Sequence, residues 1–145
     1  MPIDWVYLLN GFHGRIGRQT FWIAMGAVYV LNVLACLLAD EIQGDRLSAI
    51  VDLAFTYPEF AITLKRAHDR ELPVWLLITF FTANAVFDLL DVLGLPIEVS
   101  DTGNMLALAT MIPFAVFGVA LLVELGFRRG TAGPNKYGPD PLART

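Results

Sequence analysis

The stretch Thr20–Ala39 reads TFWIAMGAVYVLNVLACLLA, twenty residues without a charged side chain. A helix rises ~1.5 Å per residue, so this one would be ~30 Å long, which is the thickness of the hydrocarbon core of a bilayer. Trp22 near one end and Asp40-Glu41 beyond the other are typical of the edges of such a segment. The stretch therefore predicts a membrane-spanning helix, with Asn32 as its one strongly polar residue near the middle.

The composition of the whole chain agrees with this interpretation. Of 145 residues, 56% are hydrophobic and 17% are charged, whereas soluble domains have ~45–50% apolar and ~25% charged residues. So few charges leave a large apolar surface, which we expect to face lipid. The net charge of -4 gives no reason to expect nucleic acid as a partner. The single cysteine excludes an intrachain disulfide and a cysteine-built metal site.

Three further segments, 47–64, 73–93 and 104–125, are also long and apolar enough to span a bilayer. The first of these is the weakest, because it carries two carboxylates and Pro58, which removes a backbone donor. The predicted fold class is an all-α membrane protein with four transmembrane helices, divided into a cytoplasmic or interfacial segment (1–19), the transmembrane domain (20–125) and a cytoplasmic Gly/Pro-rich tail (126–145).

The basic residues predict the orientation of these spans. With four spans, nine of the ten Lys and Arg residues fall on one side of the membrane, and only Arg46 falls on the other. The positive-inside rule makes the first side the cytoplasm, so both termini are predicted to lie inside. Without the weak second span the charges would be scattered over both sides, and this supports its assignment.

A second interpretation of the first span concerns Cys36. The sequence Val33-Leu34-Ala35-Cys36, behind basic residues and an apolar run, resembles a bacterial lipoprotein processing site. The apolar run continues through Ala39, however, which places Cys36 within the membrane and not at its edge. We therefore expect an uncleaved anchor.

Three motifs in this order resemble a bacterial inner-membrane family known only as domain-of-unknown-function family 805. They are GRIGRQTFW (14–22), KRAHD (65–69) and GPNKYGPDP (133–141). The family usually continues the His-Asp pair with a small-residue turn and Gly-Trp-Trp, whereas this chain has Arg70-Glu71-Leu72-Pro73-Val74-Trp75. The resemblance implies the fold and a location in the bacterial inner (plasma) membrane, and it implies no activity.

The basic residues and the two terminal motifs suggest a cytoplasmic surface that binds anionic phospholipid headgroups or a partner protein. Each basic residue near such lipid contributes ~1 kcal/mol to binding. The plainer interpretation is that these residues only set the topology, with His68 and Asp69 hydrogen-bonded to each other. The candidate residues of this surface are Arg15, Arg18, Lys65, Arg66, His68, Asp69, Asn135, Lys136 and Tyr137.

The sequence gives no reason to expect catalysis. The pair His68-Asp69 has no Ser or Cys nucleophile near it in sequence, and Thr63 would be a guess as a third member. No phosphate-binding loop, dinucleotide fingerprint, metal-binding His pair or thiol pair occurs. We therefore predict no catalytic residues, no metal, no cofactor and no enzyme.

Polar residues inside the predicted spans suggest a cation or proton path, because carboxylates at membrane depth are costly and usually functional. The plainer interpretation is that Asp88 and Asp91 lie hydrated at the interface. Glu59 lies deeper, and we expect it to pair with Asn32, Asn84 or a basic loop residue, or to stay protonated. The candidate residues of this path are Asn32, Glu59, Asn84, Asp88 and Asp91.

Two functional hypotheses follow from these patterns. The first is a non-enzymatic interaction or lipid-contacting module with a basic cytoplasmic face. The second is a small proton or cation transporter, or a channel subunit, that uses the intramembrane carboxylates. The expected partners are the lipid bilayer with its anionic headgroups, further copies of the chain, or another membrane protein.

Overall fold

A computed structural model describes residues 3–43, 45–95 and 104–143 of the chain. In this part the chain forms helices and no β-strand, with one isolated β-bridge between Asn135 and Gly138. The prediction of an all-α fold is confirmed. The helices are α1 (Trp5–Leu9), α2 (Arg18–Gln43), α3 (Asp45–Arg70), α4 (Val74–Val92) and α5 (Asn104–Gly126).

Three of these helices, α2, α3 and α4, are long and apolar enough to cross a membrane. Met111–Gly126 in α5 forms a shorter apolar helix. Large apolar side chains of the helices point outward, for example Leu31 (59% exposed) and Leu38 (67% exposed) on α2. Lipid tails would cover such side chains at no cost. Three of the four predicted spans are thus supported by length and composition.

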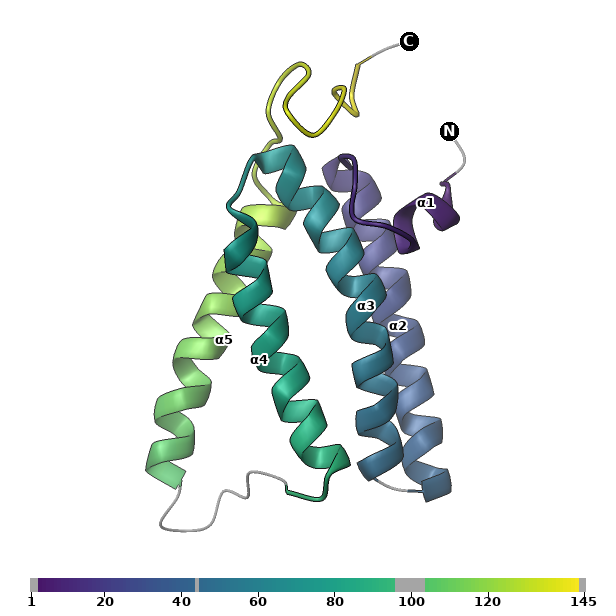
Figure 1. Ribbon diagram of the computed structural model, residues 1–145, viewed down its shortest axis with the longest axis vertical. Coiled ribbons are helices and arrows are strands. Elements are labelled where there is room, and N and C mark those ends of the chain that lie inside the picture. Colours follow the sequence, from purple (N-terminus) through teal and green to yellow (C-terminus); the bar gives the residue numbers. More distant parts are fainter. Residues whose placement is uncertain (1–2, 44, 96–103, 144–145) are drawn as a thin grey trace.

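The helices form an open bundle in which α2 and α3 lie side by side (Figure 1). α4 packs against α3, and α5 lies next to α4, where the rings of Phe80 and Phe114 stack (Figure 1). Toward the end opposite the termini, α5 diverges from the other helices, whereas α4 stays beside α3 (Figure 1). Both ends of the chain, α1 and the tail after α5 lie at one end of the bundle, which we call the terminal end (Figure 1).

The connection between α3 and α4 is shorter than the sequence suggested. The predicted spans 47–64 and 73–93 left residues 65–72 as the connection between them, but α3 continues to Arg70, so Lys65 to Asp69 are helical. The helix ends in a Schellman motif, with the N–H of Leu72 bonded to Ala67 O and the N–H of Glu71 bonded to His68 O. Glu71 has φ +54°, the left-handed conformation usually taken by glycine.

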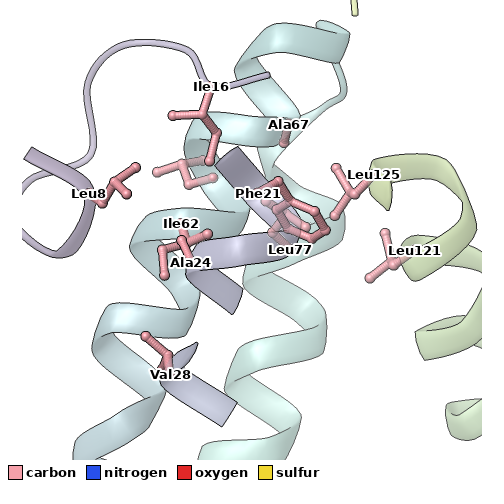
Figure 2. Close-up of a cluster of buried hydrophobic side chains, with 11 residues drawn as sticks. Leu8, Ile16, Phe21, Ala24, Val28, Ile62, Ala67, Leu77, Leu121 and Leu125 are labelled. Carbon is pink, nitrogen blue, oxygen red and sulfur yellow. The ribbon is translucent and has the colours of Figure 1, made fainter. Parts of the chain in front are cut away.

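The buried apolar core lies in the terminal half of the bundle (Figure 2). α2 contributes Phe21, Ala24 and Val28, which recur at helical spacing on one face. The facing side chains come from α3, α4 and α5, and Leu8 and Ile16 close the core from the N-terminal segment (Figure 2). The core residues of the other helices are Ile62, Leu64, Ala67, Leu77, Leu121 and Leu125.

Candidate functional site

A buried ion-pair network at the terminal end is centred on Asp69. One oxygen of its carboxylate accepts from Arg15 Nη2 at 2.8 Å and from Arg15 Nε at 3.1 Å. The other oxygen pairs with Arg66, one helical turn earlier on α3. The side chains are only 1% (Arg15), 4% (Asp69) and 0% (Arg66) exposed. Such a buried triad is stable because each charge has partners of opposite sign or carbonyl acceptors.

The C-terminal end of α5 is held by donors from α2 and α3. The last four carbonyls of a helix have no partner within it. Arg66 donates to Leu125 O (2.6 Å) and to Arg128 O (2.5 Å). The donors to the intervening carbonyls are Trp22 Nε1, 3.0 Å from Gly126 O, and Arg18 Nη1, 3.1 Å from Phe127 O. The charged donors, Arg18 and Arg66, also face the negative end of the α5 dipole, which stabilises their positive charge.

Lys65 and His68 hold the N-terminal segment in the same way. Lys65 Nζ, fully buried, donates to Leu8 O (3.0 Å) in the short helix α1 and to Gly11 O (2.7 Å) beyond its end. His68 Nδ1 lies 3.2 Å from Gly14 O, so it carries the proton of this bond. Gly14 has φ +94°, and a Cβ there would overlap the Tyr7 hydroxyl.

The tail folds back on the end of α3. Thr131 N–H donates to Asp69 O (2.8 Å), and Asn135 Nδ2 donates to His68 O (3.0 Å). The ring of Tyr137 stacks on the imidazole of His68, with centroids 3.8 Å apart and an interplanar angle of 11°. The tail is therefore an ordered part of the terminal end. We call the network of Arg15, Lys65, Arg66, His68, Asp69, Thr131, Asn135 and Tyr137 the polar knot.

Two further residues fix the path of the tail. Gly130 passes so close to Asp69 that a Cβ at this position would overlap the carboxylate. Asp140 accepts from the N–H groups of Leu142 and Gly133, each at 2.9 Å. These two bonds hold the pKa of the Asp140 carboxyl below its usual value, and the bond from Leu142 has the larger effect.

The predicted basic surface is thus divided by the fold. Arg18 and Lys136 are exposed, and Asn135 and Tyr137 are half-buried. The other predicted members, Arg15, Lys65, Arg66, His68 and Asp69, are buried. Their polar atoms are occupied by backbone carbonyls and by one another. A single exposed face made of all nine residues is therefore not what the structure contains.

A polar cleft lies at membrane depth between α2, α3 and α4. It consists of two cavities, of about 530 Å³ and 320 Å³, that share Asn32, Asp52 and Glu59. Asn32 contacts the Glu59 carboxyl, and the Cys36 thiol lies 3.0 Å from Asn32 Oδ1 and 3.3 Å from Asp52 Oδ1. The described residues that line the two cavities include no basic side chain. We call this region the intramembrane cleft.

Four of the five residues predicted for an ion or proton path line this cleft. Asn32, Glu59, Asn84 and Asp88 line the smaller cavity, and Asp91 is exposed and lines neither. Asn84 Nδ2 is used by the carbonyl of Phe80 in the preceding turn, at 2.9 Å. Within the described ranges, no group of three His, Cys, Asp or Glu side chains has the arrangement of a metal site.

The sequence interpretation missed several residues of the site. Thr131 belongs to the polar knot, Gly130 approaches the Asp69 carboxylate, and Trp22 donates to the end of α5, although none of the three is charged. A signal existed only for Trp22, which belongs to the first motif. Glu124 on α5 accepts from Arg128 (3.0 Å), one helical turn later, and from Arg70 (2.5 Å) at the end of α3.

The geometry defines a helical membrane protein whose three sequence motifs meet at one end of the bundle. A family described as "Protein of unknown function (DUF805)" matches residues 9–139. The chain belongs to this family. The match includes the first two motifs and residues 133–139 of the third, and the structure brings all three together at the terminal end.

Two relatives from Escherichia coli (strain K12) are similar over nearly the whole chain. "Uncharacterized protein YiiR" is 28% identical over 137 residues, covering 91% of this chain and 86% of the relative. "Inner membrane protein YhaH" is 23% identical over 137 residues, covering 90% of this chain and 87% of the relative. No solved structure matches the chain. The name of the second relative gives a location, and neither name gives an activity.

Proposed function

We propose that the chain is a non-enzymatic module with four spans in the bacterial inner membrane that contacts anionic lipid headgroups through its cytoplasmic terminal end. The supporting observation is that exposed apolar and exposed basic side chains occur together at this end. The relative named as an inner membrane protein supports the location, and the positive-inside rule supports the orientation.

The contact surface is what remains exposed around the polar knot. On α1, Trp5 (41%), Val6 (71%) and Tyr7 (41%) are exposed although apolar or amphipathic. Such side chains partition into the headgroup region of a bilayer. At the terminal end, the exposed basic residues without a carboxylate partner in the described ranges are Arg18, Arg129 and Lys136. We call these six residues the collar.

The test compares the lipids bound to the reconstituted protein. The protein is placed in nanodiscs of mixed neutral and anionic phospholipid, released in mild detergent, and its retained lipids are quantified by native mass spectrometry. We expect enrichment of anionic lipid. Removal of each collar charge, as in Lys136→Gln, should lower that enrichment about five-fold at most, since a charge near the surface contributes ~1 kcal/mol.

The matched control is Arg46→Gln, because Arg46 is exposed and lies on the loop side opposite the terminal end. This variant should retain the wild-type enrichment. If the lipids bound to the wild-type protein have the same composition as the bulk bilayer, the proposal is wrong.

The intramembrane cleft supports a second candidate function, proton or cation transport. The specific observation is that two cavities share two carboxylates and an amide at membrane depth. In liposomes with an imposed gradient, the wild type should then show flux that Glu59→Gln abolishes. Asp91→Asn is the control, because Asp91 lies outside both cavities. Absence of flux in the wild type rejects this candidate.

A further inference from the structure

A pocket of about 380 Å³ opens beside the polar knot at the terminal end. Small-molecule pockets have volumes of ~300–1,000 Å³. The wall comprises the start of α2, the C-terminal end of α3 and the segment that follows α5. Its charged members are Arg18, Arg66, Arg129, Asp69 and Asp140. Since α2 begins at Arg18 and α5 ends at Gly126, the pocket lies where two apolar helices end, which is headgroup level in the proposed orientation.

The charge in this pocket favours an anion. Asp69 is neutralised by Arg15 and Arg66, which pair with both of its oxygens. Asp140 is occupied by two backbone N–H groups. Counting Arg15 with the lining residues, four guanidinium groups face two carboxylates, so a positive surplus remains.

The surplus is available at the mouth of the pocket. Arg18 uses one of its nitrogens for Phe127 O, which leaves its other donors open. In the part of the chain that the structure describes, the Arg129 guanidinium has no ion pair or hydrogen bond. The planar fork of arginine suits the oxygens of a phosphate group, which it binds with two parallel hydrogen bonds.

We infer that this pocket binds a phosphate group, with Arg129 and Arg18 as its ligands and the phosphate of a lipid headgroup as its source. The inference rests on the proposed function, because it names the site and the chemical group that the collar recognises. It differs from the collar in predicting one defined site in place of a diffuse attraction.

The probes are dihexanoyl phosphatidic acid, dihexanoyl phosphatidylcholine and inorganic phosphate, added to the delipidated full-length protein in neutral detergent. Binding is followed by titration calorimetry and by the shift in Tm. We expect saturable binding of the phosphatidic acid. If inorganic phosphate binds and phosphatidic acid does not, the ligand is free phosphate and not a lipid. If phosphatidic acid binds and inorganic phosphate does not, the site is assigned to lipid.

Two variants test the assignment to this pocket. Arg129→Gln should weaken binding about ten-fold or more, because a charge-assisted hydrogen bond is lost. Ala132→Glu places a carboxylate on the exposed wall of the pocket and should abolish binding. Arg128→Gln is the control and should bind as the wild type does, because Arg128 pairs with Glu124 and does not line the pocket.

The two proposals fail in different ways. If Arg129→Gln and Lys136→Gln weaken the binding of phosphatidic acid equally while anionic lipid is still enriched in nanodiscs, the pocket proposal is wrong and the collar proposal stands. Binding of phosphatidylcholine as tightly as phosphatidic acid also overturns the pocket. If the wild type shows no enrichment of anionic lipid, the collar proposal is wrong and the pocket proposal fails with it.

Discussion

At the terminal end of the bundle the Asp69 carboxylate is paired with two guanidiniums, whereas the carboxylates of the intramembrane cleft line cavities whose described walls hold no basic side chain. Both regions place charge away from bulk water. In the polar knot nearly every polar group has a partner on another segment, so its charges connect α1, α3, α5 and the tail. In the intramembrane cleft, Asp52 contacts the Cys36 thiol and Glu59 contacts the Asn32 amide, both on α2.

This difference separates two uses of buried charge. A charge that is paired on all sides holds the structure and is unavailable to a ligand. A carboxylate that lines a cavity at membrane depth has no such structural use and is more often functional. Replacing a carboxylate by its amide should therefore lower the stability of the fold strongly in the polar knot and only slightly in the intramembrane cleft.

The largest effect is expected at Asp69. Asp69→Asn keeps the size of the side chain but leaves Arg15 and Arg66 buried without a counter-charge. Breaking a buried pair in this way costs about 3–5 kcal/mol, so we expect a large fall in Tm in detergent and poor membrane accumulation. Asp140→Asn, at the more exposed end of the tail, should have a much smaller effect. An unchanged Tm for Asp69→Asn would show that the polar knot does not stabilise the fold.

A steric substitution tests the same region without changing charge. Gly130→Ala places a Cβ against the Asp69 carboxylate, and the strain should cost about 1–3 kcal/mol in unfolding free energy. Gly26→Ala is the matched control, because a Cβ at Gly26 meets no atom within 4 Å. Equal Tm values for the two variants would contradict the close approach of tail and α3.

The docking of the tail is tested at Asn135. Asn135→Ala removes the donors to His68 O and Thr131 Oγ1, which should cost about 1–2 kcal/mol and loosen the tail. Limited proteolysis should then cleave the tail faster than in the wild type. Lys136→Ala, at an exposed neighbour, is expected to leave the cleavage rate unchanged, and faster cleavage in both variants would argue against a specific role of Asn135.

A stabilising substitution is expected at the turn after α3. Glu71 adopts a left-handed conformation that costs an L-residue about 1 kcal/mol relative to glycine. Glu71→Gly should therefore raise Tm slightly, as measured by thermal unfolding in detergent. A lower Tm would mean that the Glu71 side chain makes a contribution larger than this backbone strain.

The smallest effect on stability is expected in the intramembrane cleft. Glu59→Gln retains the size of the side chain and its contact with Asn32, and it leaves no cation unpaired. We expect the unfolding free energy to change by no more than ~0.5 kcal/mol. A loss as large as that of Asp69→Asn would erase the distinction between the two regions.

Sequence reasoning succeeded where the signal is local. The twenty apolar residues from Thr20, and the other apolar segments, predict membrane-spanning helices because the lipid core demands a minimum length of apolar residues. The three motifs indicated the family. Glu59 was expected to lie near Asn32 or Asn84, and all three line the same cavity.

The reasoning failed where the outcome depended on segments far apart in the chain. Lys65 to Asp69 were expected in the connection between two spans, because charges between apolar runs usually mark a loop. They are helical because Leu125 O, Leu8 O and Gly14 O supply acceptors from three other segments. Nothing in the local sequence of α3 states that these acceptors are near.

The sequence by itself determined that this chain consists of apolar helices of membrane-spanning length, and it predicted nine of the ten basic residues at one end of them, because hydropathy and charge are sums over neighbouring residues. Only the tertiary structure decided which of those charges are enclosed in the polar knot and which remain in the collar. The reason is energetic. A buried charge is tolerated only where partners from other segments converge on it, and that convergence is a property of the folded bundle.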